Sequence, residues 1–177
     1  YGSVRVYVAG SPSLERSVLE TGHRAAAENE RADVVVVGRD EGFHYGKLLQ
    51  AAHHVFGGAV LVGTNNDPFH LNDFGVKVPE TGALLAAVER MTGAQAEIVG
   101  KPKPYLYTRL MKDHGLAAEE CCMVGDNYMT DMLGAMRTGM RTVWIRPEGD
   151  AFSGFLPDEI AAPDATVARL EEILEFV

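Results

Sequence analysis

The chain is organised around the run Val124-Gly125-Asp126-Asn127-Tyr128-Met129-Thr130-Asp131-Met132-Leu133-Gly134-Ala135. The apolar residues 121–124 lead into it, and such a short continuous apolar run predicts a buried parallel strand. Beyond the run's first turn, apolar side chains recur at helical spacing, namely Met129, Met132, Leu133 and Met136. This spacing predicts an amphipathic helix, which Gly139 ends. The run therefore predicts a strand, a turn and a helix in succession.

Two aspartates lie in this predicted turn. Asp126 falls at the carboxyl end of the strand, and Asp131 falls in the first turn of the helix. In open parallel sheets, ligands bind at the carboxyl ends of the strands. Mg²⁺ typically takes one or two carboxylates there, with water and phosphate oxygens as its other ligands. Either aspartate alone could equally be a helix N-cap, so the pair carries the prediction of a metal site.

The rest of the chain alternates between strand and helix patterns. Strands are predicted at residues 4–8, 33–38, 59–62, 98–99, 121–124 and 141–145. Helices are predicted after Pro12, at 44–56 and 82–91, after the loop at Lys101, after Asp126, and at 167–177. This alternation predicts an α/β fold with parallel sheets. The strand at 98–99 is interpreted as the return into a second domain.

Composition excludes several classes of partner. The formal net charge is −9, and neither half of the chain carries a basic block, so we expect no nucleic-acid partner. No apolar run approaches the roughly 18 residues of a membrane span, so no membrane association is expected. The two cysteines, Cys121 and Cys122, are adjacent and are interpreted as structural thiols. In the absence of a signal-peptide pattern, the expected setting is cytoplasmic.

Several motifs together resemble a known family. The pattern G-D-x-x-x-T-D, which contains Asp126 and Asp131, resembles the fourth motif of haloacid dehalogenase (HAD)-type phosphatases. Gly100-Lys101-Pro102-Lys103-Pro104 is similar to the lysine motif of that family. Residues 38–47 and 62–67 resemble the cap of its NagD-like branch, which includes sugar-phosphate, p-nitrophenylphosphate and pyridoxal-phosphate phosphatases. The resemblance covers nearly the whole chain.

The resemblance implies a fold and a division into domains. Residues 1–98 would form an α/β cap of the class II type, which sets substrate specificity. Residues 99–177 would form the C-terminal half of a HAD-like Rossmannoid core. The fold class expected from the resemblance is therefore α/β, with the C-terminal half of the core and an α/β class II cap domain. It also leaves room for a homo-oligomer formed through the cap.

The resemblance further implies an activity and its residues. The complete protein would be a Mg²⁺-dependent phosphatase of small phosphorylated metabolites, working through an aspartyl-phosphate intermediate. Asp126 would bind Mg²⁺ directly, and Asp131 would take part in the metal site by orienting a metal-bound water, Asp126 or Lys101. Lys101 would meet the phosphate and the nucleophile as a compact positive charge. Substrate contacts would come from the cap loop, at Asn65, Asn66 and Asp67, whose residue types are also those of an ordinary turn.

The nucleophile of the family is missing from these residues. In the family it is the first Asp of D-x-D, and no D-x-D occurs in the 177 residues. We therefore expect this segment alone to be inactive and a longer parent protein, which begins before the cap, to be active. The main alternative is a non-catalytic, truncated or degenerate relative that serves as a binding or interaction module. A dinucleotide-binding oxidoreductase is disfavoured because no G-x-G-x-x-G follows a strand.

A folding expectation accompanies the missing nucleophile. Without the strands that carry the first two motifs, the second half would expose unpaired strand edges. The isolated segment should then aggregate, oligomerise or depend on the missing half. Analytical ultracentrifugation and a heteronuclear NMR spectrum check this expectation. A stable monomer with a well-dispersed spectrum would contradict it.

Overall fold

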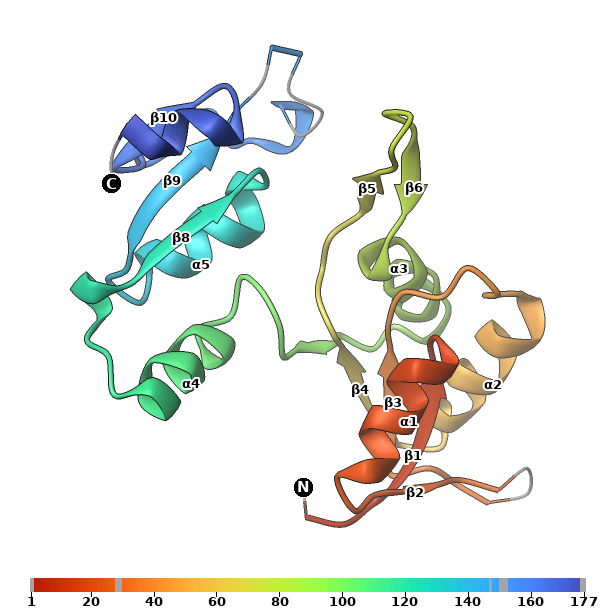
Figure 1. The fold of residues 1–177 in the computed structure, drawn as a ribbon. Helices are drawn as coiled ribbons and strands as arrows, with labels where there is room; N and C mark the ends of the chain where they lie inside the picture. The colour runs from red at the N-terminus through yellow and green to blue at the C-terminus, as the bar shows by residue number, and fades with distance from the viewer. Residues whose placement is uncertain (1, 28–29, 147, 150–152, 176–177) are drawn as a thin grey trace. The chain divides into compact units, whose positions relative to one another are not determined.

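The computed structural model describes residues 2–27, 30–146, 148–149 and 153–175. It divides the chain into two units, Tyr1–Val99 and Gly100–Val177 (Figure 1). Both units contain parallel strands connected through helices, which confirms the predicted α/β class. Among the described residues, every helix is too short or too polar to cross a membrane.

The first unit is built on a parallel sheet of β-branched strands. Its strands and helices are β1 (Arg5–Ala9), α1 (Pro12–Glu20), β2 (Arg24–Ala25), β3 (Val34–Val37), α2 (Tyr45–Phe56), β4 (Val60–Gly63), β5 (Phe69–Leu71), β6 (Lys77–Pro79), α3 (Thr81–Thr92) and β7 (Glu97–Ile98). The five-stranded sheet has the order β2-β1-β3-β4-β7, and all its pairs are parallel. β3 consists of four valines, whose branched side chains suit a central strand covered on both faces.

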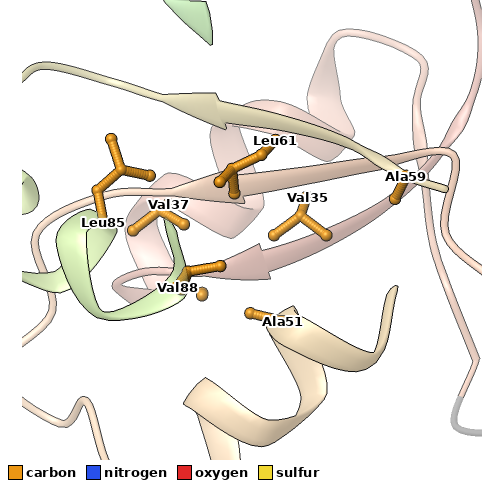
Figure 2. Close-up of a cluster of buried hydrophobic side chains, with 8 residues drawn as sticks. Val35, Val37, Ala51, Ala59, Leu61, Leu85 and Val88 are labelled. Atoms are coloured by element: carbon orange, nitrogen blue, oxygen red, sulfur yellow. The ribbon is translucent and has the colours of Figure 1, made fainter. Parts of the chain in front are cut away.

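One face of this sheet packs against two helices. Figure 2 shows Val35, Val37 and Leu61 of the strands pointing toward Ala51 of α2 and toward α3. These residues are at most 3% exposed, as are Leu85 and Val88 of α3. The burial of this shared apolar face holds α2 and α3 against the sheet. The carboxyl ends of the strands therefore have fixed positions from which the loops project.

Side-chain caps start the helices of the first unit close to the predicted residues. Ser11 accepts a hydrogen bond from the Leu14 amide at the start of α1. The His44 ring accepts one from the Gly46 amide at the start of α2. At the C-terminal end of α3, Gly93 adopts a left-handed conformation with φ of 73°, which a glycine adopts without strain.

Two elements of the first unit differ from expectation or were not predicted. The predicted strand at 98–99 is β7, and it pairs with β4 at the edge of the first sheet. Its interpretation as the start of the second domain was therefore wrong, because backbone pairing attaches it to the first unit. The hairpin of β5 and β6 was not predicted. Its turn is stabilised by the Asn72 side chain, which accepts hydrogen bonds from the Phe74 and Val76 amides.

The second unit has a smaller parallel sheet. Its elements are α4 (Tyr105–His114), a 3₁₀ turn (Ala118–Glu120), β8 (Cys122–Gly125), a π-helical turn (Tyr128–Met132), α5 (Leu133–Met136), β9 (Arg141–Ile145), a 3₁₀ turn (Ser153–Phe155), β10 (Ala165–Val167) and a 3₁₀ segment (Leu170–Glu175). The strand order is β10-β9-β8, and both pairs are parallel. Trp144 of β9 and Tyr128 and Met132 of the π-helical turn form its buried core.

The strand β8 was predicted to be buried, but in the structure it is partly exposed. Among the described strands only β9 pairs with it, so β8 forms an edge of the sheet, and Val124 is 36% exposed. An apolar pocket of about 550 Å³ extends from β8 to α4, and Leu110, Met111 and Met123 line part of it. Burial of a strand depends on neighbouring strands and helices, which the local apolar pattern does not reveal.

The predicted closing helix at 167–177 was also wrong. Val167 lies in β10 and pairs with Ile145 of β9. Asp164 secures the start of this strand, because its carboxylate accepts hydrogen bonds from the amide and the hydroxyl of Thr142. These same hydrogen bonds lower the pKa of Asp164. In place of the predicted helix, the structure has a short 3₁₀ segment, Leu170–Glu175. Residues 176–177 lie outside the described residues.

Candidate active site

The second unit brings Lys101 and Asp131 together. The Lys101 ammonium lies 2.5 Å from Oδ1 of Asp131 and donates a hydrogen bond to it. The Asp131 side chain is 4% exposed, and the Lys101 side chain is 34% exposed. A buried carboxylate needs such a partner, because its ionised form is otherwise poorly solvated. Lys101 therefore keeps part of its surface in contact with solvent while it neutralises Asp131.

Asp131 is held by the turn as well as by Lys101. Its Oδ2 accepts a hydrogen bond from the Asn127 amide at 3.2 Å. Asn127 caps the following π-helical turn, because its side chain accepts from the Met129 amide. Both carboxylate oxygens of Asp131 thus have donors within the unit. The carboxylate is oriented, and this arrangement suits an indirect role better than direct metal binding.

Asp126 differs from Asp131 in its surroundings. It directly follows β8, and it is exposed. Its carbonyl oxygen accepts a hydrogen bond of 3.0 Å from the indole Nε1 of Trp144 in β9. Within the described part of the chain, its carboxylate forms no hydrogen bond or ion pair. The backbone of Asp126 is therefore held in place, while its carboxylate remains open to a ligand.

The three residues fit a magnesium ion in their chemistry. Asp126 offers an exposed carboxylate at the end of a parallel strand, and the amide of the next residue, Asn127, binds the oriented carboxylate of Asp131. These aspartates match the one or two carboxylates that Mg²⁺ usually takes from a protein. No group of three or more His, Cys, Asp or Glu side chains arranged for metal binding occurs among the described residues. A site of the zinc type, with several such ligands, is therefore not found in that part of the chain.

Three further residues support this arrangement, and sequence reasoning missed their roles. Gly125 lies directly against Asp131, Trp144 holds the Asp126 carbonyl, and the Tyr107 hydroxyl donates to the Thr130 carbonyl at 3.0 Å. In the sequence, the type of each residue, small or largely apolar, does not indicate the contact that it makes. The Thr130 hydroxyl is buried and has no hydrogen-bond partner among the described residues.

The glycine before Asp126 yields a stability prediction. A Cβ at position 125 would lie 2.6 Å from Cγ and 2.7 Å from Cβ of Asp131. A change of rotamer cannot relieve the second contact, so Gly125→Ala must displace the turn. We expect a loss of about 1–3 kcal/mol in the free energy of unfolding, as for other overpacked sites. Urea unfolding followed by the fluorescence of Trp144, the single tryptophan of the chain, measures it.

The matched control for this variant is Gly154→Ala. Gly154 belongs to the same unit, and a Cβ there would have no heavy atom within 4 Å. This control should unfold within about 0.5 kcal/mol of the unsubstituted chain. Equal stability of the two alanine variants would contradict the tight packing of Asp131 against Gly125.

The predicted substrate residues lie in the first unit, in the loop after β4. Oδ1 of Asn65 accepts a hydrogen bond from the Asp67 amide at 3.0 Å, so this side chain shapes the turn. The Asp67 carbonyl accepts from the amide of Gly82 in α3. A Cβ on Gly82 would lie 2.6 Å from the Asn66 carbonyl oxygen, so the loop packs tightly on α3. The Asn66 side chain is exposed.

Comparison with known proteins agrees with these observations. A family model described as HAD-hydrolase-like matches residues 98–173. Chronophin of Mus musculus is 39% identical over 142 residues, which cover 78% of this chain and 49% of chronophin. An acid sugar phosphatase of Staphylococcus aureus is 33% identical over 141 residues, with 80% of this chain and 54% of the relative covered. The chain thus spans about half the length of the curated relatives it matches.

Solved structures extend the similarity to both units. A thermostable NPPase variant from Geobacillus stearothermophilus matches with a TM-score of 0.79 at 33% identity, over 96% of this chain and 66% of that one. NagD from E. coli K-12 matches with a TM-score of 0.79 at 26% identity, over 98% and 66%. These matches confirm the HAD-like fold class inferred from the motifs. The chain belongs to the HAD-like hydrolases, in the NagD-like branch.

Proposed function

We propose that these residues form the cap and the C-terminal half of the core of a Mg²⁺-dependent phosphatase. In this proposal the cap corresponds to residues 1–98 and the half-core to residues 99–177. The observation that carries it is the buried carboxylate of Asp131, which is bound by Lys101 and by the amide of Asn127. Asp126, the residue before Asn127, has an exposed carboxylate at the end of a parallel strand. The substrates would be small phosphorylated metabolites; one relative is named an acid sugar phosphatase.

Each charged residue has a separate task in the proposed reaction. Asp126 would hold the magnesium ion, which, when bound, supplies positive charge that neutralises the phosphoryl oxygens. Lys101 would offer its ammonium to the phosphate and to the attacking carboxylate. Asp131 would keep the Lys101 side chain extended toward the turn that follows β8. Such preorganised charge stabilises the transition state without reorganisation during the reaction.

The covalent step requires groups that these residues do not provide. A nucleophilic carboxylate would attack phosphorus and form an acyl phosphate, and the P–O bond to the leaving group would break. The leaving oxygen would take a proton from a general acid, and water would then hydrolyse the acyl phosphate. In the proposal both groups belong to a D-x-D motif, which is absent from the 177 residues.

The proposal makes a direct prediction for activity. The 177 residues alone should hydrolyse p-nitrophenyl phosphate no faster than the buffer with Mg²⁺. The complete protein that contains them should hydrolyse it, and EDTA should abolish this activity. A continuous assay of p-nitrophenol release measures both. Robust Mg²⁺-dependent turnover by the 177 residues alone would overturn the assignment of the nucleophile to a missing motif.

The alternative is a binding or interaction module without catalysis. It would keep the metal loop and the cap but lack the nucleophile in the complete protein. The residues that precede Tyr1 in the complete protein discriminate between the two proposals. A hydrophobic strand that ends in D-x-D would favour the phosphatase, and its absence would favour the binding module. A cytoplasmic setting and a homo-oligomer formed through the cap stay predictions.

A further inference from the structure

Tyr107 connects the two elements that carry Lys101 and Asp131. It lies in α4, the helix that follows the Lys101 loop, and it is 5% exposed. Its hydroxyl donates to the Thr130 carbonyl at 3.0 Å and lies 3.4 Å from the Asp131 carbonyl. Both carbonyls belong to the π-helical turn that presents the Asp131 side chain.

The π-helical turn explains why these carbonyls accept a side-chain donor. The Leu133 amide donates to the Tyr128 carbonyl, five residues back, which widens the turn relative to an α-helix. Widening disturbs the regular pattern of amides and carbonyls, and a buried carbonyl without a donor is costly. The Tyr107 hydroxyl supplies such a donor. Turns of this type occur frequently at functional sites.

A glycine makes room for the Tyr107 ring. A Cβ at Gly134 would lie 2.6 Å from Cε2 and 2.8 Å from Cζ of Tyr107, so the ring packs directly on the backbone of α5. The hydroxyl can reach the turn only because position 134 has no side chain. Tyr107 and Gly134 therefore act as a matched pair at the contact between α4 and the Asp131 turn.

We propose that Tyr107 is a positioning residue that holds Asp131 within reach of Lys101. The lysine side chain is flexible, and fixing it in one conformation costs entropy. The hydrogen bond from Tyr107 is a second contact between the segment of the Lys101 loop and α4 and the turn that carries Asp131. It sets the separation of these two segments independently of the ion pair. Loss of this contact lets the turn and α4 separate by small distances, and displacements of about 1 Å are enough to impair a catalytic site.

The proposal deepens the proposed function, because Lys101 and Asp131 are the groups assigned there. Its test needs no catalytic activity. The reactivity of the Lys101 amine toward trace amounts of acetic anhydride is measured by mass spectrometry on the complete protein that contains these residues. Exposed Lys103 and Lys112 serve as internal references. An amine bound to a buried carboxylate reacts slowly, so any weakening of the pair raises the Lys101 rate relative to the references.

Tyr107→Phe removes only the hydroxyl. It should raise the relative Lys101 rate roughly two- to tenfold, the range that the net contribution of one hydrogen bond produces. Gly134→Ala is a second variant, which keeps the hydroxyl but displaces the ring, and it should raise the rate similarly. Alanine is a better helix former than glycine, so α5 itself is not weakened. Trp144 emission reports whether each variant retains the fold of the unit.

The matched control is Tyr128→Phe. Tyr128 is fully buried in the same turn, but its hydroxyl donates to the Ala161 carbonyl at 2.8 Å, not to α4. This control should leave the relative Lys101 rate unchanged, and Asp131→Asn should give the largest increase. An unchanged Lys101 rate in either folded Tyr107→Phe or folded Gly134→Ala overturns the proposal. So does an equal increase in Tyr128→Phe, because the effect would then be general loosening. None of these outcomes depends on whether the complete protein is a phosphatase.

Discussion

Asp126→Asn in the complete protein should lower both the affinity for Mg²⁺ and the rate of turnover by more than about 100-fold. Removing outer partners of metal ligands typically costs 10–100-fold in affinity or activity, and Asp126 is proposed as a direct ligand. Asparagine has nearly the same size, so the loss reports the charge of the carboxylate. Isothermal titration with Mg²⁺ and the Mg²⁺ dependence of p-nitrophenyl phosphate hydrolysis measure the two effects.

The structure predicts that this variant folds normally. The Asp126 side chain is exposed and forms no hydrogen bond or ion pair within the described residues, and the Trp144 indole holds its backbone carbonyl, which the substitution leaves in place. The free energy of unfolding should therefore change by less than about 0.5 kcal/mol. Activity and stability are thus separated by a single substitution.

Asp113→Asn is the matched control for Asp126→Asn. Asp113 is in the same unit and forms a surface ion pair with Arg109 in α4. Such pairs contribute little to stability, and the residue follows no strand of the sheet. Normal Mg²⁺ affinity and turnover are expected for this control. If Asp126→Asn behaved in the same way, Asp126 would have to be removed from the site.

The local patterns of the sequence predicted several of the helices and strands. The helical spacing of residues 45–56 and the continuous apolar run of β9 were sufficient, because each such pattern matches the face that the element buries. The two aspartates could be identified because they occur as a pair, and Lys101 because its loop is similar to the lysine motif of the family. The Lys101 loop leads from β7 of the first sheet into α4, and the contact of Lys101 with the Asp131 carboxylate is visible only in the structure.

Pairing between distant segments could not be predicted in the same way. β7 has only two residues, and its place follows from pairing with β4, not from its own pattern. The apolar residues around Val167 fit a helix and a strand equally well, and the hydrogen bonds between Asp164 and Thr142 decide for the strand. The exposure of β8 depends on which strands lie beside it.

The supporting residues of the site were missed for a related reason. A tyrosine or tryptophan with apolar neighbours is ordinarily a core residue, and only coordinates show where its single polar atom points. Trp144 directs its indole N–H to the Asp126 carbonyl, before the π-helical turn, and Tyr107 directs its hydroxyl to the Thr130 carbonyl, within that turn. Gly125 is part of the G-D-x-x-x-T-D pattern, but its close contact with the Asp131 side chain is visible only in coordinates.

Lys101→Ala in the complete protein should lower turnover by roughly 10²–10³-fold, as loss of one preorganised charge contact to the transition state does. Lys103→Ala is the matched control, because Lys103 is an exposed lysine of the same loop, and it should keep normal turnover. Steady-state rates at saturating Mg²⁺ measure both. A normal rate for Lys101→Ala would remove the lysine from the proposed mechanism.

A catalytic role of Lys101 can be separated from its structural role. Lys101→Ala leaves the Asp131 carboxylate, which is 4% exposed, without its cation, and an uncompensated buried charge destabilises the fold. Adding Asp131→Asn removes that charge, while the asparagine oxygen can still accept from the Asn127 amide. The double variant should therefore be more stable in urea than Lys101→Ala alone. Its turnover should stay as low as that of Lys101→Ala, because neither change restores the positive charge. Recovery of turnover together with stability would show that Lys101 acts only by neutralising Asp131.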